Sequence, residues 1–166
     1  MFGPALTRLA EDLLAQCRAA GHTLATAESC TGGLVAGLLT SIAGSSDVFE
    51  RGFVTYSNAA KIADLGVDDR IIAGSGAVSE ETARGMAEGA LRHSQADIAI
   101  AVTGIAGPGG GSAAKPVGLV HVAAARRGNI TLHRRLMLGD AGRERVRLAA
   151  VEAALQIGAE AAAGTP

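Results

Sequence analysis

The chain has 166 residues, of which 48% are hydrophobic and 19% charged, a balance that suits one globular core. A formal net charge of -1, with one Tyr, three Phe and no Trp, argues against a nucleic-acid partner, because such proteins present basic patches and aromatic platforms. No apolar run reaches the ~18 residues of a membrane-spanning helix, and we expect no secretory leader, because the first residues lack a basic segment followed by an uninterrupted apolar core. We therefore expect one soluble, cytoplasmic domain over residues 1–166 that contacts no membrane.

Helical and strand patterns alternate through the first half of the chain. Apolar residues at helical spacing predict the first helix, and Gly21 ends it. A short apolar strand then leads into the pair Gly32 and Gly33, after which a second amphipathic helix begins. In chain order we expect a helix at 5–20, a strand at 23–27, a helix at 34–42, a loop at 44–47, a strand at 48–56, a helix at 58–65 that Asn58 caps, and a loop at 68–76.

The second half adds a helix, the most apolar strand, a hairpin and a last helix. The segment from Ile98 to Val102 is continuously apolar, as expected for a strand that is covered on both faces. The expected elements are a helix at 79–95, this strand, a Gly-rich loop at 104–116, hairpin strands at 118–125 and 130–138, and a helix at 142–162. This order predicts an α/β fold, a three-layer α/β/α sandwich with a mixed, mostly parallel sheet that ends in an antiparallel hairpin.

Three of the expected strands end in polar residues. Ser29 and Thr31 follow the first strand, Tyr56 ends the second with Lys61 just beyond, and Thr103 follows the third. Ligands of open α/β sheets collect at the carboxyl ends of the strands, so we expect these side chains to form one site. A Ser or Thr before a helix also serves as an N-cap, which is the structural alternative for Ser29 and Thr31.

Ser29 is the candidate nucleophile of this site, and it needs a base. The four histidines precede a strand, lie inside a helix or lie in the middle of the hairpin strands, so none is placed for a Ser-His-Asp triad. Lys61 is the remaining candidate, provided that burial lowers the pKa of its amine. Tyr56 would orient or relay the proton, and the backbone N–H groups of residues 31–33 would stabilise the oxyanion.

Cys30 is the rival nucleophile, because a helix start makes a thiol more acidic. Neighbouring residues at a strand end point to opposite sides, so a Ser29 that faces the site leaves Cys30 facing the packed interior. Neither Cys30 nor Cys17, the other cysteine, has the spacing of a metal site. We therefore expect two free thiols and no bound metal.

Several motifs occur in order along nearly the whole chain. They are Ala27-Glu28-Ser29-Cys30-Thr31-Gly32-Gly33, Tyr56-Ser57-Asn58 with Lys61, Gly76-Ala77-Val78-Ser79, the segment from Ala101 to Gly110, and Lys115-Pro116-Val117-Gly118. Together they resemble the CinA C-terminal domain family, whose standalone members hydrolyse the carboxamide of nicotinamide mononucleotide to nicotinate mononucleotide and ammonia. The resemblance implies a serine amidase without metal or organic cofactor, in which Ser29 is the nucleophile, Lys61 is its base, and Tyr56 and Thr103 lie beside them.

Given this resemblance, we infer that two Gly-rich turns bind the nucleotide. The turns after Thr31 and Thr103 would receive its phosphate or ribose, and Arg143 would pair with the phosphate. The family commonly shows Gly-Asp-Arg before the last helix, whereas here Ala141 and Gly142 separate Asp140 from Arg143, which displaces that arginine. We expect no function of the N-terminal domain that full-length CinA proteins carry. The expected substrate-binding residues are Thr31, Gly32, Gly33, Asn58, Gly104, Gly107 and Arg143.

Two functions remain open from the sequence. The first is the deamidation of nicotinamide mononucleotide by Ser29, activated by Lys61. The alternative is a catalytically silent nucleotide-binding module that acts through a protein partner. In either case we expect a homodimer, the commonest assembly of small soluble proteins.

Overall fold

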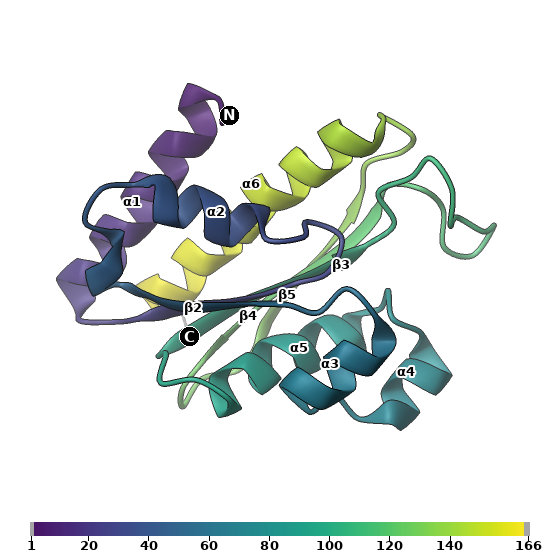
Figure 1. The fold of residues 1–166 in the computed structure, drawn as a ribbon, viewed down its shortest axis with the longest axis horizontal. Helices are drawn as coiled ribbons and strands as arrows, with labels where there is room; N and C mark the ends of the chain where they lie inside the picture. The colour runs from purple at the N-terminus through teal and green to yellow at the C-terminus, as the bar shows by residue number, and fades with distance from the viewer. Residues whose placement is uncertain (1, 165–166) are drawn as a thin grey trace.

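A five-stranded sheet organises the fold in the computed structural model, which describes residues 2–164 (Figure 1). Its strands are β1 (Leu24–Glu28), β2 (Phe49–Val54), β3 (Ile98–Gly104), β4 (Leu119–Arg126) and β5 (Leu132–Met137). They lie in the order β2-β1-β3-β4-β5. Strand β1 pairs in parallel with β2 and β3, whereas β4 pairs antiparallel with β3 and β5. The sheet is therefore mixed and ends in the antiparallel hairpin that the sequence predicts.

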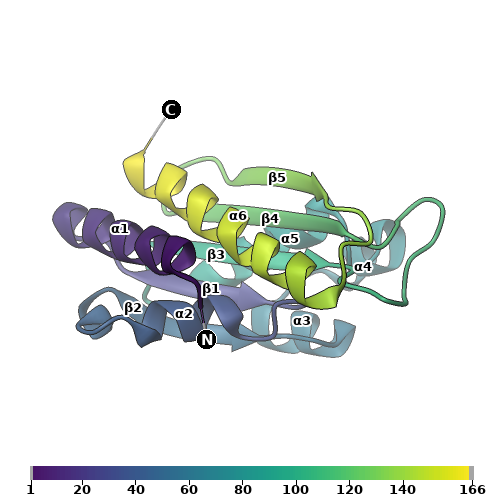
Figure 2. The same cartoon turned by 90° about the horizontal axis from the view of Figure 1, so that it is seen from above.

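Helices lie on both sides of the sheet (Figure 1 and Figure 2). One side holds α1 (Pro4–Ala20), α2 (Leu34–Ser41) and α6 (Arg143–Ala163), and the other holds α3 (Asn58–Leu65), α4 (Asp69–Ser75) and α5 (Glu80–Arg92). A 3-10 turn at Ser45–Asp47 precedes β2. This arrangement confirms the expected three-layer sandwich. No helix within residues 2–164 combines the length and the apolar character that crossing a membrane requires.

The two faces of the sheet carry side chains of different size. Ile98 and Ile100 of β3 pack in one core with residues of α1, α2 and α6. Ala99 and Ala101, on the opposite face, pack in a second core with α5. Because these side chains are small, α5 can lie close to the sheet. Side chains alternate along a strand, so Thr103 continues the alanine face. Its hydroxyl therefore points toward the side of the sheet that holds α3, α4 and α5.

The loop expected at 68–76 is wrong, because this segment contains α4. Asp68 caps the helix, since its carboxylate accepts the backbone N–H of Arg70 at 2.9 Å. The helix has seven residues and buries none of them. Its sequence consequently lacks the periodic apolar pattern by which a helix is recognised.

The boundaries between β2 and α3 also differ from the expected ones. Ser57, not Asn58, caps α3, and its hydroxyl accepts the N–H of Ala60 at 3.0 Å. Strand β2 ends at Val54, so Tyr56 lies in the turn that follows the strand. This turn brings the first residues of α3 back toward the end of β1.

Candidate active site

Ser29 and Lys61 lie side by side in the interior of the protein. Ser29 directly follows β1, and Lys61 lies in the first turn of α3. The Nζ of Lys61 is 3.0 Å from the Oγ of Ser29. Both residues are buried, with 8% of Ser29 and 1% of Lys61 exposed. At this separation an amine is within reach of the proton of a hydroxyl nucleophile.

Two backbone carbonyls hold the amine of Lys61. Its Nζ donates to the carbonyl oxygen of Thr55 at 2.9 Å and to that of Tyr56 at 3.3 Å. Burial lowers the pKa of Lys61 below its ordinary value, because desolvation disfavours the charged form. A neutral amine has two N–H groups and one lone pair, so it can satisfy both carbonyls and direct the lone pair at the hydroxyl of Ser29.

A cavity of about 200 Å³ lies beside the serine and the lysine. Residues from the end of β1, the turn before α3, the end of β3 and the start of α6 meet there. The sequence-predicted site residues that line it are Ser29, Tyr56, Asn58, Lys61, Thr103, Gly104 and Arg143. Cys30, Ala77, Val78 and Ala106 complete the lining.

Thr103 links the sheet to the segment before α5. Its side chain is buried, and its hydroxyl donates to the carbonyl oxygen of Ala77 at 2.7 Å. The hydroxyl proton is thus engaged, while the lone pairs of the oxygen can still accept a hydrogen bond. Thr103 is suited to shape the cavity and to accept a hydrogen bond from a ligand there.

Tyr56 contacts the site in two different ways. Tyr56 is 63% exposed, and its hydroxyl accepts from Nη2 of Arg143 at 3.2 Å. The other terminal nitrogen of Arg143 donates to the carbonyl of Gly107 at 2.8 Å. Lys61 contacts the backbone carbonyl of Tyr56 rather than its hydroxyl. A proton relay through the phenol therefore has no contact to support it.

The start of α2 is not an open anion site, because the carboxylate of Glu28 fills it. Glu28 is fully buried and accepts the backbone N–H groups of Gly33, Val35 and Ala36 at 3.0, 3.0 and 2.8 Å. A negative charge at this end of a helix is favourable, since the helix dipole is positive there. Sequence reasoning missed this role, although Glu28 is the one charged residue of β1 and stands four residues before Gly32.

Some expected substrate-binding residues do not line the cavity. They are Thr31, Gly32, Gly33 and Gly107. The N–H of Gly32 donates to the carbonyl of Ser29 at 3.0 Å, and Glu28 holds that of Gly33. Among the three N–H groups expected to stabilise an oxyanion, only that of Thr31 lacks an acceptor within residues 2–164. Gly32 and Gly33, with φ of 60° and 95°, form a left-handed turn that other residues rarely adopt, and Gly33 takes the N-cap position.

Arg147 of α6 fixes the turn that carries Ser29, and sequence reasoning missed it as well. Its Nε donates to the carbonyl of Cys30 at 3.1 Å and its Nη2 to that of Thr31 at 2.8 Å. Residues four apart lie on the same face of a helix, so the spacing of Arg143 and Arg147 was an available signal.

Cys30 lies at the edge of the cavity but belongs to the apolar core. Only 6% of it is exposed, and burial raises the pKa of its thiol to about 11. The thiol is therefore protonated at neutral pH, whereas a cysteine nucleophile must be a thiolate. Within residues 2–164, no group of three or more His, Cys, Asp or Glu side chains is placed to hold a metal ion.

The fold and the site define an α/β protein that buries a serine and a lysine in contact at the carboxyl end of its parallel strands. The sequence model of the CinA C-terminal domain family matches residues 6–161 of this chain. The chain belongs to this family.

Relatives of known sequence and structure agree with this assignment. The nicotinamide-nucleotide amidohydrolase PncC of Escherichia coli (strain K12) is 51% identical over 152 residues, which cover 91% of each protein. The CinA-like protein of Anaeromyxobacter sp. (strain Fw109-5) is 48% identical over 95% of this chain, but the match covers only 38% of that protein. For other long relatives the covered share is as low as 25%. The structure of the competence/damage inducible protein CihA from Agrobacterium tumefaciens is 53% identical, with a TM-score of 0.93 over 95% of each chain.

Proposed function

We propose that this chain is an amidohydrolase that converts nicotinamide mononucleotide to nicotinate mononucleotide and ammonia. The main observation behind the proposal is the contact of 3.0 Å between the buried amine of Lys61 and the hydroxyl of Ser29, beside a cavity. The relation to PncC, whose name states that it hydrolyses a nicotinamide nucleotide, supports this choice of substrate.

In the first half of the proposed reaction, Ser29 is acylated. Its Oγ attacks the carboxamide carbon while Nζ of Lys61 accepts the hydroxyl proton. Lys61 then gives this proton to the leaving nitrogen as the C–N bond breaks. Ammonia leaves, and the nicotinoyl group stays bound to Ser29 as an ester. The backbone N–H of Cys30, a residue that lines the cavity, has no backbone acceptor within residues 2–164 and is the candidate to stabilise the oxyanion.

In the second half, water hydrolyses the ester. Lys61 accepts a proton from the water as its oxygen attacks the ester carbon. The bond to Oγ of Ser29 breaks, and Lys61 returns the proton to that oxygen. Nicotinate mononucleotide is released, and both side chains are back in their starting forms.

The test is the release of ammonia and nicotinate mononucleotide from nicotinamide mononucleotide by the purified protein. We expect Ser29→Ala to lower kcat by several orders of magnitude, because it removes the nucleophile. Cys30→Ala, the matched control at the neighbouring position, should keep its activity within about twofold. Ammonia release by Ser29→Ala at the rate of the unsubstituted protein, or none by the latter, would refute the proposal.

A catalytically silent nucleotide-binding module is not favoured by the relation to an amidohydrolase. Such a module would bind the mononucleotide without converting it, so multiple turnovers per protein molecule would rule it out. The single domain over residues 1–166, the homodimer and the cytoplasmic location stay predictions. Measuring the mass of the protein in solution tests the homodimer.

A further inference from the structure

We call the cavity beside Ser29 and Lys61 the catalytic cavity. A second cavity, of about 620 Å³, adjoins it, and Val78 lines both. The catalytic cavity, at about 200 Å³, is smaller than the ~300–1,000 Å³ that small-molecule sites usually occupy. The ring that bears the carboxamide is the smaller part of a mononucleotide, so we place it in this cavity beside Ser29. The rest of the substrate must therefore extend beyond it, and the second cavity offers adjoining space.

A row of side chains across the sheet joins the two cavities. Thr103 of β3 is paired with His121 of β4, which is paired with Arg135 of β5. Side chains opposite one another on neighbouring strands lie on the same face, and strands are ~4.8 Å apart, so Arg135 is about 10 Å from Thr103 along this row. Thr103 lines the catalytic cavity, and the other two line the second.

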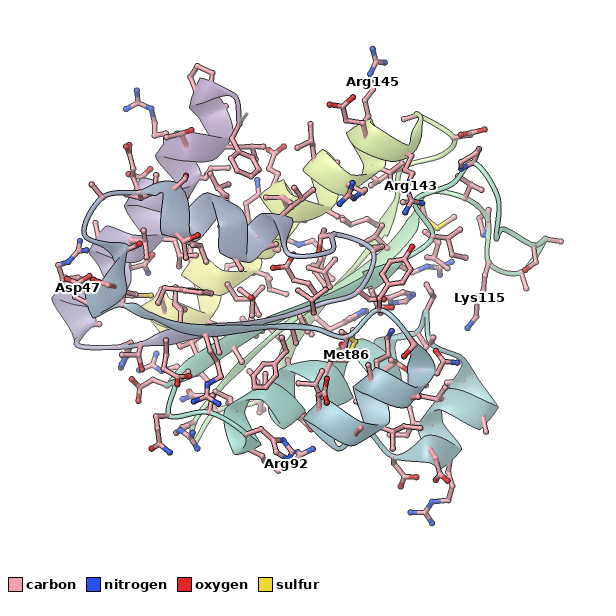
Figure 3. The ribbon with its side chains drawn as sticks, viewed as in Figure 1. Asp47, Met86, Arg92, Lys115, Arg143 and Arg145 are labelled. Carbon is pink, nitrogen blue, oxygen red and sulfur yellow. The ribbon has the colours of Figure 1, made fainter. Side chains whose placement is uncertain are left out.

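Two cations line the second cavity and keep hydrogen-bond donors available. Nζ of Lys115 donates to the carbonyls of Ser75 and Val78, the latter at 2.8 Å, which leaves one of the three N–H groups of the ammonium. Figure 3 shows Lys115 at the same end of the molecule as Arg143, which lines the catalytic cavity. Arg135 is exposed, forms no ion pair within residues 2–164, and makes one 3.6 Å contact to the sulfur of Met137.

The remaining charged and titratable groups of this cavity are Glu80, Glu81, His121 and His133. Glu80 pairs with Arg84 at 2.7 Å and lies 3.4 Å from His133. His133 in turn bonds to His121 at 2.9 Å, and burial lowers the pKa of His121 to about 4, so this imidazole is neutral at pH 7. Glu81 adds acceptor oxygens, which suit the hydroxyls of a sugar.

We infer that the second cavity receives the ribose phosphate of the mononucleotide, and that Arg135 binds the phosphate with Lys115 beside it. A guanidinium with free donors is suited to a phosphate, because it can form two parallel charge-assisted hydrogen bonds. Arg143, the phosphate partner expected from the sequence, is instead held by Tyr56 and Gly107. This inference rests on the proposed function.

The test measures binding rather than turnover, in protein that carries Ser29→Ala and so cannot consume the ligand. Calorimetry compares nicotinamide mononucleotide with nicotinamide riboside, which lacks the phosphate. We expect Arg135→Met to weaken binding of the mononucleotide about 10- to 100-fold and to change that of the riboside less than about twofold. Arg135→Lys should restore part of the loss. Arg145→Met is the matched control, since this arginine is exposed and points away from the molecule (Figure 3).

The binding measurements test the phosphate site, whereas the ammonia assay tests the proposed amidase activity, so the two can fail independently. Equal weakening of both ligands by Arg135→Met, or no weakening of the mononucleotide, would overturn the phosphate site. So would Ser29→Ala protein that binds the mononucleotide no better than the riboside. If the mononucleotide binds through Arg135 but the unsubstituted protein releases no ammonia, the phosphate site stands and the proposed amidase activity fails.

Discussion

The amine of Lys61 has three oxygen neighbours and, within residues 2–164, forms no ion pair with a carboxylate. Burial lowers its pKa, and the proposed base must be neutral, so kcat/KM should rise with pH through a midpoint below the ordinary lysine value of 10.5. Between the folded pKa and 10.5 the unfolded chain binds more protons, so stability should also rise with pH in that window. Rates measured from about pH 6 to about pH 10 test this.

Lys61→Arg is the control for this prediction. A guanidinium keeps its proton throughout this range, so the variant should lose turnover at every pH while still binding the nucleotide. A rate that does not change with pH in the unsubstituted protein, or activity near its level in Lys61→Arg, would remove Lys61 from the role of base.

At the scale of residues, seven of the residues that line the cavity could be predicted, but not all of their contacts. Ser29, Lys61 and Thr103 were predictable, because each follows a segment whose strand pattern is clear. The sequence does not show that the backbone carbonyl of Tyr56, rather than its hydroxyl, holds the lysine. Every residue has a carbonyl, so such a contact depends on the turn geometry and leaves no signal in residue type.

At the scale of elements, Glu28 joins the end of β1 to the start of α2. Glu28→Gln keeps the shape of the side chain but replaces one carboxylate oxygen by an amide nitrogen, which is a donor and would face backbone N–H groups. The substitution also removes the negative charge that the dipole of α2 favours. We expect it to lower the free energy of unfolding by about 1–3 kcal/mol, measured by urea denaturation. Glu11→Gln, on the exposed surface of α1, should change it by less than about 0.5 kcal/mol. Equal stability of the two variants would contradict the capping role.

The same scale explains where the predicted elements were right or wrong. The long helices and β3 were predictable, because their apolar residues recur with the period of a helix or form a continuous run. Helix α4 was not, since it buries no residue and depends on the cap at Asp68 and on packing against α5. The Gly pair before α2 predicts an open anion site there, but the charge that fills this site, Glu28, lies on the strand before the pair.

At the scale of the whole molecule, the site exists only in the folded sheet. Its residues come from the segment after β1 and from α3, β3 and α6, and the second cavity adds residues from β4 and β5. The strand order β2-β1-β3-β4-β5 brings these segments together at one end of the sheet (Figure 1). The mixed topology could be predicted, because the order of elements favours it, but the cavities depend on side chains from distant segments.

A ligand that needs all of these segments binds the folded chain and not the unfolded one, so it should raise the melting temperature. For the Ser29→Ala protein, nicotinamide mononucleotide at about 100 times its Kd adds about 2.7 kcal/mol to the free energy of unfolding. In a protein of this size that corresponds to a rise in Tm of roughly 5–10 °C, measured by calorimetry. Sodium chloride at the same ionic strength is the control. A rise no larger than that with sodium chloride alone would mean that the nucleotide does not bridge these segments, and both proposed sites would lose their support.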